Sequence, residues 1–374
     1  MSDFPEVAER LRKERGYSLR ALARAVPCDP SYLSKVLNGR KAPSAKLASR
    51  LDDLLQSGGE LTDARAPSTA QERDLGGFVA PELIGYFRDQ LSGHYEADMY
   101  LGPSHLVSVV QVQAELVMKL AGDARDKTVR QGLLDVGTAY AAMLGWLHQD
   151  AGDLTASARW RDVTLDMAHR AGDPDLVSYA LSNKAMLASD GKNGRTVLDF
   201  AAAARAAGPA LTPKTRVIAL QHAAQGHAML GDRDASSRLI DEAAVLIPSV
   251  DDEHPWGNAC HRTPNWAEAQ RATCYGKAGD YAGAARVWDE IMDAMPASAR
   301  RDNAVFATRQ AAALARVPEP DRVVALAAQA ADVARNTASA RLRRELAALP
   351  AHARGWRDSA AGRQLTEIVA QVAA

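Results

Sequence analysis

Hydroxyl, amide and basic side chains are concentrated between Ser18 and Lys41. Short hydroxyl groups and lysine can hydrogen-bond to the edges of DNA bases, whereas basic and polar side chains beside a chain turn are suited to phosphate oxygens. We therefore predict two sets of DNA contacts. The first set, which we expect to contact base edges, is Ser31, Tyr32, Ser34 and Lys35, together with Asp29 and Pro30 at the start of the same helix. The phosphate-binding set is Ser18, Arg20, Asn38, Arg40 and Lys41.

Local signals predict the helices that position these side chains. Ser18 can cap a short helix whose apolar residues recur at helical spacing as far as Val26. Asp29 can cap a second helix, with Pro30 in its first position and Asn38-Gly39 at its end. A third helix follows the basic turn. Two short helices at this spacing are typical of a helix-turn-helix, which places its second helix in the major groove of DNA.

Three motifs in this stretch resemble the helix-turn-helix of the phage-repressor (Cro-like, XRE) regulators. They are Leu19-Arg20-Ala21-Leu22-Ala23, Ser31-Tyr32-Leu33-Ser34 and Asn38-Gly39-Arg40-Lys41-Ala42-Pro43-Ser44. The resemblance covers about residues 5–57 and implies a DNA-binding domain over residues 1–57. Leu37 departs from the pattern, because the family often has an acidic residue there, and we expect the turn to lack one polar anchor.

The distribution of charge agrees with that interpretation. Residues 1–57 hold 11 Lys and Arg against 7 Asp and Glu, a net charge of +4, whereas the rest of the chain holds 34 against 39, a net charge of −5. A basic N-terminal region on an acidic chain confines DNA contacts to that region. One domain of this size buries too little surface to select a genomic site. We therefore predict a homodimer on an operator of two half-sites in double-stranded DNA.

The composition of the 374 residues favours an all-α chain, since alanine is abundant, aromatic residues make up only 5% and runs of β-branched residues are few. Three cysteines cannot form a disulfide framework, which is typical of a reducing cytoplasm. The N-terminus lacks the apolar core of a signal peptide, and no apolar run approaches the ~18 residues of a membrane span. We therefore expect a soluble cytoplasmic protein without membrane contact.

Two further regions follow the N-terminal domain. Residues 58–77 are rich in Gly, Ser and mixed charges and predict a linker, and helical patterning is nearly continuous over residues 78–374. Residues 265–296 resemble a tetratricopeptide (TPR) repeat, a helix pair joined at Gly279-Asp280. Further copies are predicted at 217–248 and 138–170, with weaker ones near 178–207 and 304–335. We expect a TPR-like right-handed helical repeat array; the alternative is an irregular helical bundle.

A 16-residue segment, Ser249 to Pro264, interrupts the repeats and has no periodicity. Loops of this length inside a compact array are often functional. Cys260, His261 and the distant Cys274 are too few and too poorly spaced for a zinc site, so we expect no metal. We expect Trp256 to anchor the segment to the repeats. The sequence also lacks a Gly-rich phosphate loop, an HExxH motif and a nucleophile elbow, so we expect neither enzymatic activity nor a cofactor.

The combination of an XRE head with a TPR array resembles regulators common in actinobacteria. It implies a transcriptional regulator whose repeats dimerise, bind a peptide or small-molecule effector, or both. The alternative is a TPR adaptor that holds a protein partner, with weak or vestigial DNA binding.

The first helix of each TPR unit lines the concave surface, which suggests where an effector would bind. Counting from the turn glycines, the inward positions are Trp146, Gln149, Asn183, Gln221, Gln225, Trp266, Thr273 and Lys277. Amide side chains could bond to a peptide backbone, and the two tryptophans could hold an apolar side chain. The alternative is that these are ordinary solvated helix positions.

Overall fold

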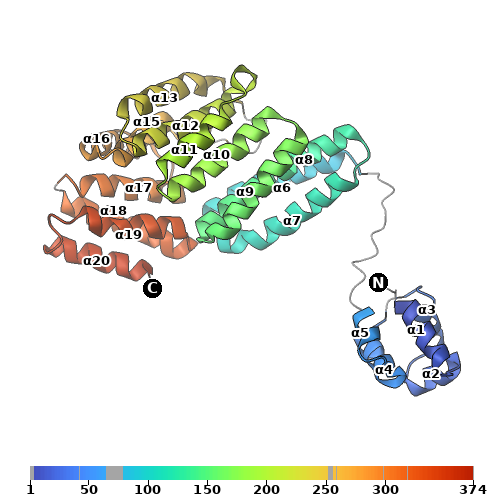
Figure 1. Ribbon diagram of the computed structural model, residues 1–374. Coiled ribbons are helices and arrows are strands. Elements are labelled where there is room, and N and C mark those ends of the chain that lie inside the picture. Colours follow the sequence, from blue (N-terminus) through green and yellow to red (C-terminus); the bar gives the residue numbers. More distant parts are fainter. Residues whose placement is uncertain are drawn as a thin grey trace. The chain divides into compact units, whose positions relative to one another are not determined.

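The computed structural model describes residues 4–41, 43–64, 79–251, 256–257, 259–297, 299–317 and 319–373. Every regular element in these ranges is a helix (Figure 1), so the predicted all-α fold class is confirmed. The chain divides into two compact units, Met1–Gly76 and Gly77–Ala374, which we call the head and the body.

The described part of the head consists of helices around one apolar core. They are α1 (Phe4–Glu14), α2 (Leu19–Ala25), α3 (Pro30–Leu37), α4 (Ala45–Leu55) and α5 (Glu60–Ala64). Leu22 and Leu33 are fully buried at the centre of this core. The side chains of Ser18, Asp29 and Ser44 accept hydrogen bonds from backbone N–H groups in the first turns of α2, α3 and α4. The two N-caps predicted for the helix-turn-helix are therefore present.

Helix α5 corrects the predicted start of the linker at residue 58. Leu61 is fully buried against the head, and Asp52 near the end of α4 accepts hydrogen bonds from the backbone N–H groups of Gly59 (2.7 Å) and Leu61 (2.9 Å). One apolar residue in a polar stretch is too weak a pattern to predict so short a helix, because its position is fixed by tertiary contacts. The rest of the predicted linker, residues 65–77, lies outside the described residues.

The body is a series of helix pairs that follow one another in space (Figure 1). The first members of the pairs are α6 (Glu82–Leu101), α8 (Lys127–Ala151), α10 (Pro174–Asp190), α12 (Pro213–Met229), α15 (Trp266–Lys277), α17 (Arg300–Leu314) and α19 (Ala340–His352). Their partners are α7 (Pro103–Asp123), α9 (Leu154–Ala171), α11 (Gly194–Ala204), α13 (Arg233–Leu246), α16 (Tyr281–Ile291), α18 (Pro320–Thr337) and α20 (Ala360–Ala373). A short helix, α14 (Ala259–Arg262), precedes α15. This arrangement agrees with the predicted helical repeat array.

In three of these pairs, the two helices are joined by the same kind of turn. Gly152, Gly231 and Gly279 have φ angles of 89°, 84° and 78°, a left-handed conformation that glycine adopts without steric cost. Each glycine is followed by an aspartate whose carboxylate accepts a backbone hydrogen bond and caps the second helix of the pair. Turn and cap together explain why the Gly-Asp dipeptide marks the repeats in the sequence.

The segment between α13 and α15 is held to the repeats by Trp256, as predicted. Its ring is buried and stacks on Tyr179 of α10, with 4.4 Å between ring centroids. The ammonium of Lys214 lies 5.4 Å from the centre of the same ring. These contacts fix the segment between α10 and α12.

The last helices of the body return to its first ones. Helix α17 contacts α6, and α19 contacts α8; in Figure 1 the red helices accordingly lie beside the cyan and green ones. Arg301 of α17 is buried between Asp98 of α6 and Asp150 of α8 and forms an ion pair with each. Ser339, just before α19, donates a hydrogen bond of 2.5 Å to the same Asp150. Buried charges thus join helices some 150 to 200 residues apart in sequence.

A glycine allows the closest approach at this junction. Gly102, between α6 and α7, has a φ angle of 73°, and a Cβ atom there would lie 2.2 Å from the carbonyl oxygen of Thr337. Any other residue at this position would force the end of α18 away from the start of the body. We call the contacts around Arg301, Asp150 and Gly102 the closing junction.

We predict that Arg301→Met lowers the free energy of unfolding of the body by about 3–5 kcal/mol, because the buried Asp98 loses its cation and the buried Asp150 keeps only the more distant guanidinium of Arg341, at 3.8 Å. Urea unfolding followed by tryptophan fluorescence measures this, since all six tryptophans lie in the body. Arg335→Met, which removes an exposed ion pair with Asp332, is the control and should change stability by less than about 1 kcal/mol. Equal effects of the two substitutions would contradict this role of the closing junction.

Candidate nucleic-acid interface and central cavity

One face of α3 and the turn after it presents polar and basic side chains to solvent. Leu33, Val36 and Leu37 of α3 are buried in the head. The predicted contact residues are all exposed or half-buried. The exposed ones are Ser18, Arg20, Asp29, Pro30, Ser31, Lys35, Asn38, Arg40 and Lys41; the half-buried ones are Tyr32 and Ser34. The predicted division of α3 into a core side and an outer side therefore matches the structure.

Several of these side chains already have structural hydrogen bonds. Asp29 accepts from the backbone N–H of Tyr32 (2.9 Å), and the side-chain amide of Asn38 donates to the backbone oxygen of Ser34 (2.8 Å). Asn38 therefore anchors the turn that was expected to lack a polar anchor, and Leu37 packs into the core instead. Caps of this kind make the orientation of α3 rigid, which favours a fixed contact surface.

The basic side chains of this face remain available. Within the described residues, Arg20, Lys35 and Arg40 form no ion pair, whereas Arg10 and Arg12 on α1 are paired with glutamates. The ammonium of Lys41 lies 5.0 Å from the centre of the Tyr32 ring. The free cations of the head thus include three of the predicted contact residues, which can neutralise phosphate charges or bond to bases.

The body contains a cavity of about 610 Å³ enclosed by the first helices of the pairs. Residues from α6, α8, α10, α12, α15, α17 and α19 all line it, together with Gly257, Ala259 and Thr263 from the segment that Trp256 anchors. Its volume is in the range of sites for small organic ligands. We call it the central cavity.

The structure brings most of the predicted groove residues to this cavity. Those that line it are Trp146, Gln149, Asn183, Gln221, Gln225, Trp266 and Lys277. Thr273 does not line it, which corrects that assignment: its hydroxyl is buried, donates to the backbone of Ala269 and accepts from Arg309 at 3.3 Å. Helical spacing located the inward face but could not predict that a long side chain from α17 would cover one position.

Most of the amide groups are paired with other side chains. Gln149 donates to Asp190 (2.8 Å), and Gln149 and Asn183 both accept from the guanidinium of Arg161. Gln225 donates to the side-chain oxygen of Gln270 at 3.2 Å. These amides are less available to a peptide backbone than the sequence suggested, and they form a network at one wall of the cavity.

Several charged cavity residues were not predicted. They are Asp98, Asp190, Lys192, Asp302, Arg309, Arg341, Arg344 and Glu345. Many belong to α17 and α19, where the repeat pattern is weakest and gives no register for inward positions. Arg309 pairs with Glu345 at 3.1 Å and Arg344 with Asp190 at 2.8 Å, so that the last helices close the cavity with ion pairs.

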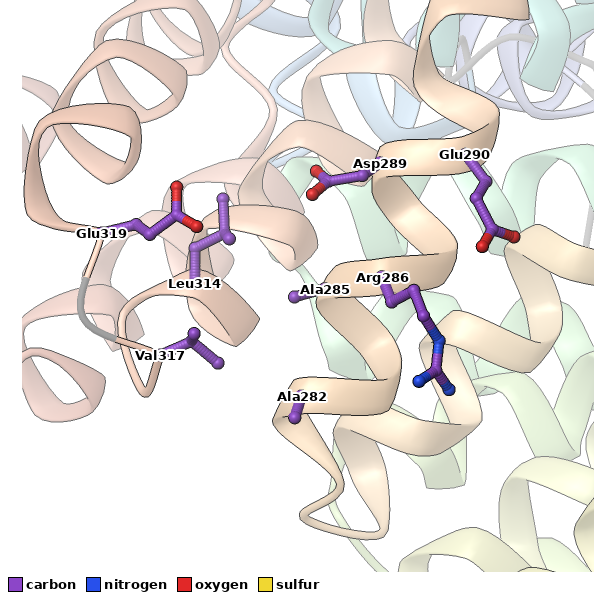
Figure 2. Close-up of a pocket in the computed structure, with 8 residues that line it drawn as sticks. All are labelled: Ala282, Ala285, Arg286, Asp289, Glu290, Leu314, Val317 and Glu319. Carbon is purple, nitrogen blue, oxygen red and sulfur yellow. The ribbon is translucent and has the colours of Figure 1, made fainter.

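A second hollow, of about 420 Å³, lies on the outside of the repeats between α16 and the turn from α17 to α18 (Figure 2). Figure 2 shows Asp289 and Glu319 directed toward it from opposite sides. Both carboxylates form ion pairs with Arg322, and Asp289 also accepts from Gln310 at 2.7 Å. Because its polar groups join neighbouring helices, we assign no ligand to this hollow.

The described ranges contain no group of three or more His, Cys, Asp or Glu side chains arranged to hold a metal ion. Cys260 and Cys274 are buried in separate apolar clusters of the body. Within the same ranges, no helix has the length and apolar character needed to cross a membrane.

Comparison with known proteins supports the interpretation of the head. Residues 6–64 match a family described as a helix-turn-helix domain, and this range includes α5. The head is therefore a helix-turn-helix domain. No curated protein matches the chain.

Two solved structures share a broad likeness with the chain. Bacillus thuringiensis PlcR in complex with the peptide PapR7 and DNA is 13% identical, with a TM-score of 0.33 over 78% of this chain and 95% of that one. A monomeric mutant of IFIT1 with Gppp-AAAA is 11% identical, with a TM-score of 0.35 over 99% of this chain and 94% of that one. Likeness at this level implies neither a ligand nor a partner for this chain.

We predict that His222 makes the body less stable in acid. Burial and the nearby cations Arg161 and Lys277 lower the pKa of His222 to about 4. Between its unfolded pKa near 6.5 and about 4, the unfolded chain binds a proton that the folded chain does not, so stability falls as pH falls. From pH 7 to pH 4.5 this costs about 2 kcal/mol.

The variant His222→Gln should therefore lose about 2 kcal/mol less than the wild type between these pH values in urea unfolding followed by tryptophan fluorescence. Burial and Asp173 raise the pKa of Asp135 to about 6, an opposite effect that is common to both proteins and cancels. If His222→Gln lost as much unfolding free energy as the wild type between pH 7 and pH 4.5, the assignment to His222 would be wrong.

Proposed function

We propose that the protein is a sequence-specific, DNA-binding transcriptional regulator of the XRE type. The observation that carries the proposal is the outer face of α3 in a helix-turn-helix domain, where Lys35 is exposed and has no carboxylate partner among the described residues. In a helix-turn-helix the second helix lies in the major groove, and here that helix is α3. Ser31 and Lys35 would then meet base edges, and Arg20 and Arg40 would meet phosphates.

The body would control the head rather than carry out a reaction. We propose that it holds two copies of the chain together and that its central cavity binds an effector. A homodimer would place two heads on two half-sites about one helical turn apart. Footprinting of the purified protein on DNA upstream of its own gene tests the proposal: a protected site of two half-sites is expected, and purely non-specific binding would contradict it.

We predict different effects for two substitutions in the head. Lys35→Ala should reduce the preference for operator over random DNA by about tenfold, because a base contact is lost. Arg40→Ala should weaken binding to both DNAs equally and reduce the salt dependence by about one unit, because a phosphate contact is lost. Gel shifts at several salt concentrations measure both, with Arg335→Ala in the body as control. If only Arg40→Ala changed the sequence preference, the proposed orientation of α3 would be wrong.

We place the dimer contact on α7. Val109, Val112 and Leu116 form an apolar stripe along its solvent side, and Val112 is 67% exposed. Exposed apolar groups at helical spacing are typical of contact surfaces. Val112→Glu should therefore give a monomer in light scattering. Val245→Glu, at a 78% exposed valine on α13, is the control and should remain dimeric. A dimer that survives Val112→Glu would place the contact elsewhere.

A further inference from the structure

Two buried cations form no ion pair with a described carboxylate: Lys277, which lines the central cavity, and Arg161, which bonds to two amides that line it. Arg161 of α9 has no exposed surface, and its guanidinium bonds only to the amide oxygens of Gln149 and Asn183. Its Nε has no hydrogen-bond partner among the described residues. Lys277, at the end of α15, lines the cavity and donates to the hydroxyl of Ser189 at 3.1 Å. Neither cation forms a hydrogen-bonded ion pair with a described carboxylate; Asp190 acts on both cations, and Glu345 on Lys277, only as nearby charges.

The carboxylates nearest to these cations already have other partners. Asp190 pairs with Arg344 and accepts from Gln149, and Glu345 pairs with Arg309. Asp98, at the α6 wall, is held by Arg301 in the closing junction. Asp302 lies two helical turns before Arg309 on α17. Arg161 and Lys277 therefore share their nearest carboxylates, Asp190 and Glu345, with Arg344 and Arg309, so this part of the cavity holds more cationic than anionic groups.

The titration of two groups reflects this charge. Burial, and after it the guanidinium of Arg309, lowers the pKa of Lys277, and the carboxylates of Glu345 and Asp190 partly oppose this shift. His222 on α12 is held neutral by burial and by the cations Arg161 and Lys277. Buried cations without partners are unfavourable, and an anion bound beside them would remove that cost.

Apolar side chains from several helices also line the cavity. Trp266 is buried beside it, Phe306 lines it from α17, and Met143 and Met186 line it from α8 and α10. The ring of Trp146 also lines it and is covered on one face by the guanidinium of Arg341, at 4.5 Å from the ring centre. A ligand that fills the cavity would thus meet both apolar surface and the ammonium of Lys277.

We propose that the central cavity binds a small organic anion, with its charged group at Lys277 and Ser189 and its apolar part against Trp266 and Phe306. This deepens the proposed function by naming the chemical class of the effector, but the binding itself requires neither DNA nor a dimer. A carboxylate, a sulfonate or a phosphate ester could supply the charge. The cavity volume is in the range that holds a drug-sized ligand with an aromatic body of two or three rings.

A matched pair of fluorescent probes tests the proposal on the full-length protein. 8-Anilinonaphthalene-1-sulfonate and N-phenyl-1-naphthylamine share an aromatic body, and only the first carries an anionic group. In fluorescence titrations, Lys277→Met should weaken binding of the sulfonate at least tenfold and leave binding of the neutral probe within about twofold. Lys277→Arg keeps the charge and should keep the preference. Lys192→Met, which removes an exposed cation that also lines the cavity, should change neither affinity.

A measurement on the wild type does not depend on how the variants fold. Decanoate should displace the neutral probe at a concentration at least tenfold lower than decanol does. Equal displacement by the two, equal losses of both probes in Lys277→Met, or no probe binding by the wild type would each overturn the proposal. Gel shifts on the same samples distinguish this proposal from the proposed function. If the wild type bound the probes but no specific DNA, only the proposed regulator function would be contradicted. If it bound specific DNA but not the probes, only the anion site would be contradicted.

Discussion

The ion pairs of Arg301 with Asp98 and Asp150 hold the body in the form that encloses the central cavity. A series of helix pairs held only by neighbouring contacts would remain open, because each pair buries its apolar surface on the next. Here α17 and α19 return to α6 and α8, and the junction is fixed by buried charge and by the close approach at Gly102. Removing one partner would leave a buried charge poorly compensated, and this would strongly destabilise the closed arrangement of the body.

Closure also determines the electrostatics of the cavity. The last helices contribute Arg309, Arg344 and Glu345, which pair with one another or with Asp190 of α10. These pairs occupy the carboxylates that could otherwise neutralise Lys277 and Arg161. A ligand that paired with Lys277 would touch both the middle of the array and its last helices, and could thereby alter the closing junction.

The head follows a different principle, since its order comes from short-range caps. Ser18, Asp29 and Ser44 each bond to a backbone N–H three residues on, and Asn38 bonds back to Ser34. These contacts set the directions of the helices independently of the body. The outer face of α3 is consequently presented by a small rigid unit, as a surface that contacts DNA requires.

Features that depend on local pattern could be predicted from the sequence: the capped helices of the head, the Gly-Asp turns of the repeats and the inward face of helices such as α8 and α12. Helical periodicity and N-cap chemistry act over a few residues, so they can be identified from the sequence. Only the tertiary structure placed α5 on the head, covered Thr273 with Arg309 and paired the amides of Gln149 and Asn183 with Arg161. It also buried Arg301 between two aspartates. An arginine has the same local signature whether it is solvated or buried. Its partners here lie 12 to 203 residues away, where loop closure and packing decide which groups meet.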